Sequence, residues 1–487
     1  MKFTSFSAAA LAAALLSGST HAGFPDEDDS RLSLQLTRKL SNNDQKGKHN
    51  DNDNTIDLIV KYKNEEGHTF ADSFDKNGKG RVISQKRHTE TITAKINDMD
   101  KLKKDPNIEY VELDVERHAF PNMRGYEVVA GKGGRRLSEE TPYGIDMVNP
   151  DSPTPRLQQG STSIKVCVVD TGYDNDHIDL PELDPNTGGF SPYEGQSWSN
   201  DGHGHGTHCA GTIGAMGGND KGVTSVNPDP TKFSFYIGKG LTDSGSGSSS
   251  GVMEAVQKCV DAQANIISMS LGGGAPTNAE LEQYREHYED DGVLIIAAAG
   301  NGGNSGYSYP ASYKYVMSVA AVDSNKNKAG FSQFNDQVEI AAPGVSVKST
   351  LPGNAYASWS GTSMATPHVA GVAALVWSHF PDCSNKQIRE ALIASAEDLG
   401  AGGCDNEYGF GLVDAKAAYD YLSNRGCGFS VGETLGGCNQ CVECTSAPTS
   451  SPTAFPVCPD NEKYFKLSLE TDNYGGETSW KVTSPTS

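Results

Sequence analysis

The sequence predicts an α/β protein whose main domain has three layers, a mostly parallel β-sheet with helices on both faces. Two kinds of segment alternate between residues 142 and 422. Short apolar runs typical of buried strands occupy residues 166–169, 266–270, 293–298 and 315–321. Longer segments with helical patterns follow, among them 253–263 and 366–379. Because parallel neighbours need long crossover connections, this order favours a parallel sheet covered by helices.

A smaller α/β domain is expected before it, at residues 55–119. Ile56, Leu58 and Val60 alternate as in a strand, and residues 110–115 form a second such run. Residues 90–104 are expected to form a polar helix. The glycine-rich, basic stretch within residues 120–141 indicates an exposed linker between the two domains.

Both ends of the chain carry segments outside these domains. Residues 1–22 are interpreted as a signal peptide, with Lys2 before an apolar run and small residues up to Ala22. That run is too short to cross a bilayer, and no other approaches it, so export without a membrane span is expected. Residues 427–487 are Cys-rich and then Ser/Thr/Pro-rich, and end in a segment that resembles part of a β-module.

The net charge of the chain limits the classes of partner that it is expected to bind. The formal net charge is −22, and the acidic excess lies after residue 136. An acidic surface argues against nucleic acid as a partner. Export also makes disulfides permissible among the ten cysteines.

Three short motifs in the large domain suggest catalytic chemistry. Asp170 ends the apolar run 166–169, and His205 opens a glycine-rich helix start at residues 204–211. Ser363 begins a helix in which Pro367 is expected in the first turn, where a missing N–H costs nothing. Acyl transfer needs these groups: a serine nucleophile, a histidine base, and a carboxylate that orients the imidazole.

An oxyanion would need hydrogen-bond donors beside the serine. A helix N-terminus supplies free N–H groups, and Asn301 follows the strand 293–298 with an amide side chain. A metal cluster of His203, His205 and His208 is the alternative, but it leaves Ser363 and Asn301 unexplained.

The motifs together resemble the subtilisin family of serine endopeptidases. Aspartate, histidine and serine follow one another in that family's order and approximate spacing, an order that is itself taken from subtilisin. Further similar segments span residues 142–422, at 245–251, 269–273, 342–345, 349–353 and 409–415. The resemblance implies a subtilisin-like fold in which Asp170, His205 and Ser363 form the triad and Asn301 is the oxyanion donor.

The resemblance also implies how substrates bind. Ser270, Leu271, Gly272 and the stretch 245–251 would pair with an extended peptide, as sheet edges do. Small residues, among them Gly272 and Gly300, with Ala298 and Ser308, imply a roomy apolar pocket for P1, the residue before the scissile bond, and broad specificity. No cofactor is implied for catalysis. Asp179 matches a calcium-ligand aspartate of the family, so a structural calcium is expected, with a solvated loop carboxylate as the alternative.

The domain at residues 55–119 resembles the family's inhibitory propeptide. The resemblance implies a secreted, monomeric zymogen that acts on proteins or peptides and is blocked by its own propeptide. Arg135-Arg136 fits either a dibasic site cut by another protease or a solvated basic linker. Self-cleavage near Phe120 or Tyr126 is the other route of processing that the sequence allows. The rival interpretation is an inactive, subtilisin-like scaffold or binding protein.

The family's fold implies some cysteine pairings as well. Cys209 follows the histidine motif, where related enzymes have a buried free thiol. Cys167 and Cys259 would lie on adjacent elements and could bridge, and Cys383 could pair with Cys404. Unpaired buried thiols are the alternative for either pair.

Overall fold

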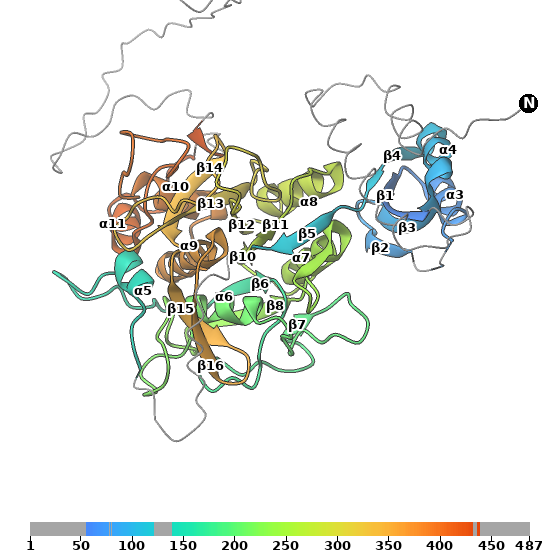
Figure 1. The fold of residues 1–487 in the computed structure, drawn as a ribbon. Coiled ribbons are helices and arrows are strands. Elements are labelled where there is room, and N and C mark those ends of the chain that lie inside the picture. The colour runs from blue at the N-terminus through green and yellow to red at the C-terminus, as the bar shows by residue number, and fades with distance from the viewer. Residues whose placement is uncertain (1–54, 77, 79, 121–138, 432–435, 439–487) are drawn as a thin grey trace, which may run out of the picture. The chain divides into compact units, whose positions relative to one another are not determined.

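The computed structural model describes residues 55–76, 78, 80–120, 139–431 and 436–438. Its centre is a seven-stranded sheet in the order β14-β13-β12-β10-β6-β8-β7, in which every neighbouring pair is parallel (Figure 1). This confirms the predicted fold class. The strands are β6 (Ile164–Val169), β7 (Gly189–Phe190), β8 (Phe233–Gly238), β10 (Ile266–Met269), β12 (Leu294–Ala298), β13 (Val316–Val322) and β14 (Val338–Pro343).

Helices cover the sheet. α9 (Thr362–Trp377) is buried along all sixteen residues, as expected of a helix that is apolar on every side. It contacts α6 (His205–Gly214) and five strands, and α7 (Ser249–Asp261) and α8 (Asn278–Glu289) contact each other and further strands. The remaining elements are α5 (Tyr143–Val148), α10 (Asn385–Ala394), α11 (Ala415–Arg425) and the hairpin β15 (Val347–Leu351) and β16 (Ala355–Trp359).

The N-terminal domain is an antiparallel sheet in the order β2-β3-β1-β4, with its own apolar core. The helix expected over residues 90–104 is wrong in its first half, because β3 runs through Lys95. That strand, TETITAK, is rich in β-branched residues with a period of two. The elements are β1 (Thr55–Tyr62), α3 (Glu65–Asp72), β2 (Arg81–Ser84), β3 (Thr89–Lys95), η1 (Ile96–Asp98), α4 (Met99–Lys104) and β4 (Ile108–Leu113).

A short strand, β5 (Glu116–Ala119), carries the chain from the N-terminal domain into the large one. It lies between β11 (Leu271–Gly272) and β9 (Ser246–Ser248), antiparallel to both. The two segments predicted to bind an extended peptide therefore pair with residues 116–119 of the same chain.

Two carboxylates of the segment before β5 bind the N-termini of helices in the large domain. Glu112 accepts hydrogen bonds from the backbone N–H groups of Asn278 and Ala279, at 2.9 and 2.8 Å, where α8 begins. Asp114 accepts from the backbone N–H of Ser250 in the first turn of α7, at 2.9 Å. A carboxylate at a helix N-terminus satisfies free N–H groups and complements the helix dipole.

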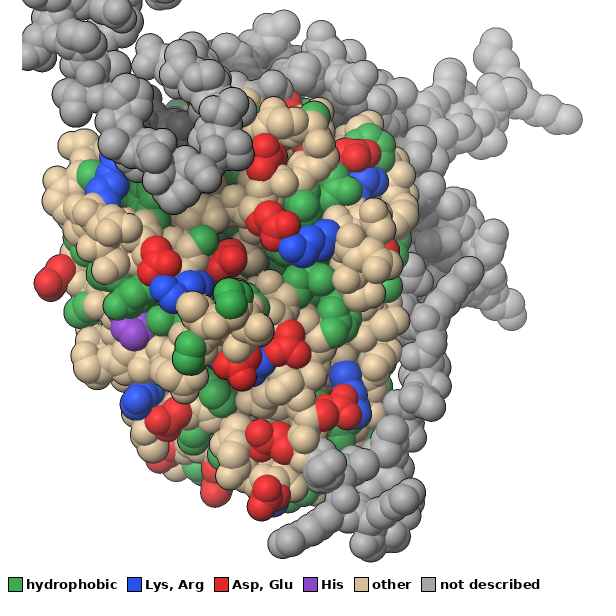
Figure 2. Space-filling model, turned by 90° about the vertical axis from the view of Figure 1, so that its left-hand side faces the viewer, with side chains coloured by type: hydrophobic (Ala, Val, Ile, Leu, Met, Phe, Trp, Pro, Cys, Tyr) green, Lys and Arg blue, Asp and Glu red, His purple; other side chains and the backbone are tan. Residues whose placement is uncertain are grey.

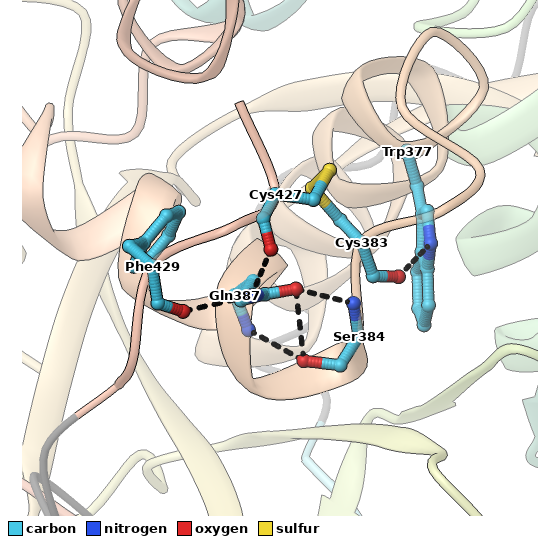
Figure 3. Close-up of a disulfide and its surroundings, with 6 residues drawn as sticks. All are labelled: Trp377, Cys383, Ser384, Gln387, Cys427 and Phe429. Atoms are coloured by element: carbon cyan, nitrogen blue, oxygen red, sulfur yellow. Dashed lines mark hydrogen bonds between the residues drawn. A yellow bond between two sulfur atoms is a disulfide. The ribbon is translucent and has the colours of Figure 1, made fainter. Parts of the chain in front are cut away.

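Three disulfides occur among the described residues. Cys167–Cys259 is confirmed, but Cys383 pairs with Cys427, and Cys404 pairs with Cys438, so the Cys383–Cys404 pairing is wrong. The reason is that the end of α11 lies beside the start of α10, where Gln387 Nε2 donates to the carbonyls of Cys427 and Phe429 (Figure 3). This contact brings Cys427 to Cys383.

Charged side chains are frequent on the surface of the protein, as its composition predicts (Figure 2). On the face in Figure 2, acidic and basic side chains are interspersed, and hydrophobic side chains occur in small groups. Within the described part of the chain, no helix is both long and apolar enough to cross a membrane. The expected signal peptide and the tail from residue 439 onward lie outside the described residues.

Candidate active site

The four residues predicted to act together lie at the carboxyl edge of the parallel sheet. Asp170 follows β6, Asn301 lies three residues after β12, His205 is the first residue of α6, and Ser363 is the second residue of α9. Open α/β sheets bind their ligands at this edge, because the loops after all parallel strands meet there.

Asp170 and His205 are hydrogen-bonded and fully buried. His205 Nδ1 lies 2.7 Å from Asp170 Oδ1, which also accepts from the backbone N–H of Thr171 at 2.7 Å. Burial alone would lower the pKa of His205, but the Asp170 carboxylate raises it above its ordinary value. The pair therefore favours the protonated imidazole, as a catalytic base needs when it takes up a proton.

Asp201 positions this pair, and the sequence analysis missed it. Its Oδ1 accepts from the hydroxyl of Thr171, next to Asp170, and from the N–H of Gly204, next to His205, at 2.8 and 2.7 Å. Its Oδ2 accepts from the N–H of Thr207 at 2.9 Å. An aspartate just before a glycine-rich helix start is a capping signal that could have revealed it.

Ser363 faces the end of β5 rather than the imidazole. Its Oγ donates to the carbonyl oxygens of Ser270 and Phe120, at 3.0 and 3.3 Å. His205 Nε2 has no hydrogen-bond partner among the described residues. The structure thus places the hydroxyl beside a peptide carbonyl.

Pro367 holds Ser363 in a way that differs from the prediction. The helix begins at Thr362, so Pro367 lies in its second turn, not its first. There its missing N–H would have bonded the carbonyl of Ser363, four residues earlier. That carbonyl accepts instead from Ser270 Oγ at 2.8 Å and from Cys209 Sγ at 3.5 Å. Ser270 thus supports Ser363, and the pairing with β5 runs over the next two residues, Leu271 and Gly272.

Asn301 is oriented by the helix that carries Ser363. Its Oδ1 accepts from the backbone N–H of Thr362 and from the Thr362 hydroxyl, both at 2.9 Å. With the amide oxygen held there, Nδ2 donates to the carbonyl oxygen of Phe120 at 2.6 Å. The Phe120 carbonyl therefore lies between an amide donor and the serine hydroxyl.

The ring of Phe120 lies beside Gly272, one of the residues expected to line the P1 pocket. A Cβ atom at Gly272 would lie 2.7 Å from the ring and 2.7 Å from Ser308 Oγ, so glycine leaves the space that the ring occupies. Leu271 and Gly272 pair with Ala119 and His118 of β5. The hydrogen bonds of Gly300 go instead to Thr362 and Gln333.

The histidine cluster considered as a metal site is not assembled. The ring of His208 stacks on Trp359 at 4.9 Å, and its Nε2 contacts the carbonyl of Ala357. Burial lowers the pKa of His208 to about 3. Cys209 is a buried free thiol, with its Sγ 4.0 Å from His205 Nδ1, and burial raises its pKa.

Asp179, the expected calcium ligand, accepts hydrogen bonds from three groups. Its Oδ1 accepts from Asn219 Nδ2 at 2.7 Å, and its Oδ2 accepts from the N–H of Val223 and the hydroxyl of Tyr356, at 3.0 and 3.1 Å. Calcium requires a shell of oxygen ligands, whereas three hydrogen-bond donors surround this carboxylate. Calcium binding at Asp179 stays a prediction.

Three features together define a serine peptidase site. They are a buried aspartate–histidine pair, a serine at the start of a helix, and an amide side chain that donates to the same carbonyl oxygen as the serine hydroxyl. The subtilase family model matches residues 161–411, and the chain belongs to this family. It is a subtilisin-like serine endopeptidase.

Individual relatives agree with this assignment. Subtilisin DY of Bacillus licheniformis is 42% identical over 285 residues, which cover 58% of this chain and 99% of the relative. Alkaline elastase YaB of a Bacillus strain is 42% identical over 321 residues, 66% of this chain and 76% of the relative. The crystal structure of the subtilisin-like protease Apa1 from Pseudoalteromonas sp. AS-11 is 30% identical, with a TM-score of 0.52, and the match covers 60% of this chain and 99% of that one.

Proposed function

We propose that the protein is secreted as a zymogen and hydrolyses peptide bonds after large apolar residues. The observation that carries the proposal is the Phe120 carbonyl, 2.6 Å from Asn301 Nδ2 and 3.3 Å from Ser363 Oγ. The segment of the chain up to Phe120 binds as a substrate would, with its backbone in a sheet and its ring in the P1 pocket.

In the proposed mechanism, Ser363 Oγ attacks the scissile carbonyl while His205 Nε2 takes its proton. The oxyanion accepts from Asn301 Nδ2 and from the backbone N–H of Ser363, which has no acceptor inside the helix. The C–N bond then breaks as His205 gives the proton to the leaving nitrogen. Water hydrolyses the acyl-enzyme by the same transfers, with Asp170 stabilising the imidazolium in both halves.

The zymogen part of the proposal predicts the first cut. With Phe120 at P1, the bond that breaks joins Phe120 to Pro121, and the proline restricts Phe120 to the extended conformations that a bound strand needs. We expect the earliest shortened product, from full-length chain expressed in a secreting host, to begin at Pro121 on N-terminal sequencing. A first product that begins at Leu137 or Glu127 would instead indicate cutting after Arg136 or Tyr126.

The P1 pocket gives a second prediction. Replacing Gly272 by valine puts carbon atoms where the Phe120 ring lies, so hydrolysis after phenylalanine should fall by on the order of 10-fold or more. Hydrolysis after alanine should persist, because a small side chain leaves room. The measurement is kcat/KM on two peptides that differ only at P1.

Gly274→Val is the matched control. A Cβ at Gly274 meets no atom within 4 Å, so this variant should treat both peptides as the wild type does. Equal losses on the two peptides in Gly272→Val would place the P1 side chain elsewhere.

A further inference from the structure

The strand that occupies the active site carries an arginine in a fully buried position. Arg117 lies three residues before Phe120, at the position called P4 in a substrate. Its side chain and that of Glu280 on α8 are both 0% exposed. Charged side chains are almost never fully buried unless they are paired. The Arg117–Glu280 contact is therefore a specific pairing and not a chance surface contact.

The contacts match a guanidinium. Arg117 Nε donates to Glu280 Oε1 at 3.0 Å, and Nη2 donates to Glu280 Oε2 and to the carbonyl of Ala275, the latter at 2.8 Å. The two parallel bonds are the bidentate geometry of an arginine–carboxylate pair. A lysine would offer a single ammonium in place of this fork.

The large domain supplies all of the site except the arginine. Thr277, Glu280 and Ala275 lie at the start of α8 or just before it, and the hydroxyl of Tyr313 lies 3.0 Å from Glu280 Oε2. Among the described residues, Glu280 Oε1 has no hydrogen-bond partner other than Arg117. Once residues 55–120 leave, the carboxylate of Glu280 therefore faces the P4 position with one oxygen open to water or to a substrate.

The sequence around Glu280 suggests a different role for this residue. Thr277 and Glu280 have the spacing of a capping box, in which the glutamate would bond the N–H of Thr277. Instead, that N–H donates to Tyr313 Oη at 2.7 Å, and of the two residues only Thr277 caps the helix, by accepting from the N–H of Glu280 at 3.2 Å. The carboxylate of Glu280 is thus free to face β5.

We propose that the mature enzyme selects arginine at P4 of its substrates, and that Glu280 is the residue that determines this preference. The proposal rests on the proposed function, since it concerns the same site. A substrate with a neutral P4 side chain covers the carboxylate without pairing it, and an unpaired buried charge is costly. His118 at P3 is exposed and Ala119 at P2 is buried, so the preferred sequence is Arg-Xaa-Ala-Phe, with a small residue before a large apolar one.

The test uses the processed enzyme obtained by expressing the full chain. Two p-nitroanilides, Arg-His-Ala-Phe and citrulline-His-Ala-Phe, differ only in the charge at P4, because citrulline has nearly the shape of arginine. We expect kcat/KM for the arginine peptide to be higher by on the order of 10²-fold. In Glu280→Gln this ratio should fall to near one, while the citrulline peptide is still cleaved.

Glu282→Gln is the matched control on the same helix. Glu282 contacts Lys61 and Tyr110 of the N-terminal domain, at 2.8 and 3.3 Å, and not Arg117, so the preference for arginine should remain. Equal kcat/KM for the two peptides with wild-type enzyme would overturn the proposal and leave the proposed function intact. Cleavage of neither peptide, nor of any other, would overturn the proposed function itself.

Discussion

Ser363→Ala is expected to lower kcat by about 10⁶-fold, a magnitude carried over from subtilisin. The Ser363 hydroxyl lies 3.3 Å from the Phe120 carbonyl oxygen, and alanine removes it without changing the helix. The precursor should also stay at full length, because the nucleophile that would cut it is missing. Peptide hydrolysis and labelling by a fluorophosphonate probe measure the two effects together.

The control is Ser358→Ala, which removes the same hydroxyl from β16, outside the site. This variant should be labelled and shortened like the wild type. If Ser363→Ala keeps its hydrolytic activity, the nucleophile has been wrongly assigned. If the wild-type protein is shortened but not labelled, the inactive scaffold becomes the better interpretation.

Asp170→Asn is expected to lower kcat by about 10⁴-fold, a magnitude that comes from serine peptidases including subtilisin. It should also change the pH dependence of the activity that remains. Because the carboxylate raises the pKa of His205, its loss lowers that pKa. The base must be neutral to act, so the acid limb of the kcat/KM profile should move to lower pH.

Asp176→Asn removes one negative charge from an exposed position near Asp170 in sequence and serves as the control. Its pH profile should match that of the wild type. A limb that stays in place in Asp170→Asn, or moves to higher pH, would show that Asp170 does not stabilise the imidazolium.

The large domain could be predicted from the sequence because its strands are buried on both faces. Continuous apolar runs such as Leu294–Ala298 are recognisable without knowledge of their neighbours. The N-terminal domain is harder to predict, because β3 contains polar residues and Ile92, Ile96 and Leu102 suggest a polar helix there. Its strand pairing with β1 determines its conformation, and pairing partners are distant in sequence.

The candidate site could be predicted where a single motif carried a role, as with Asp170, His205, Ser363 and Asn301. Roles that depend on a tertiary contact could not. Ser270 supports the Ser363 carbonyl only because Pro367 leaves it without an N–H. Likewise, Cys383 meets Cys427 because α11 ends beside α10, which no spacing of cysteines reveals.

The helix N-termini that bind Glu112 and Asp114 would lose these carboxylates if the chain were cut after Phe120. Under the proposed processing, these carboxylates help α7 and α8 to form and then depart with the N-terminal domain, and water takes their place. The mature chain, once unfolded, would have to refold without them. Its durability would then be set by the height of the unfolding barrier, so that a half-life describes it better than an equilibrium constant.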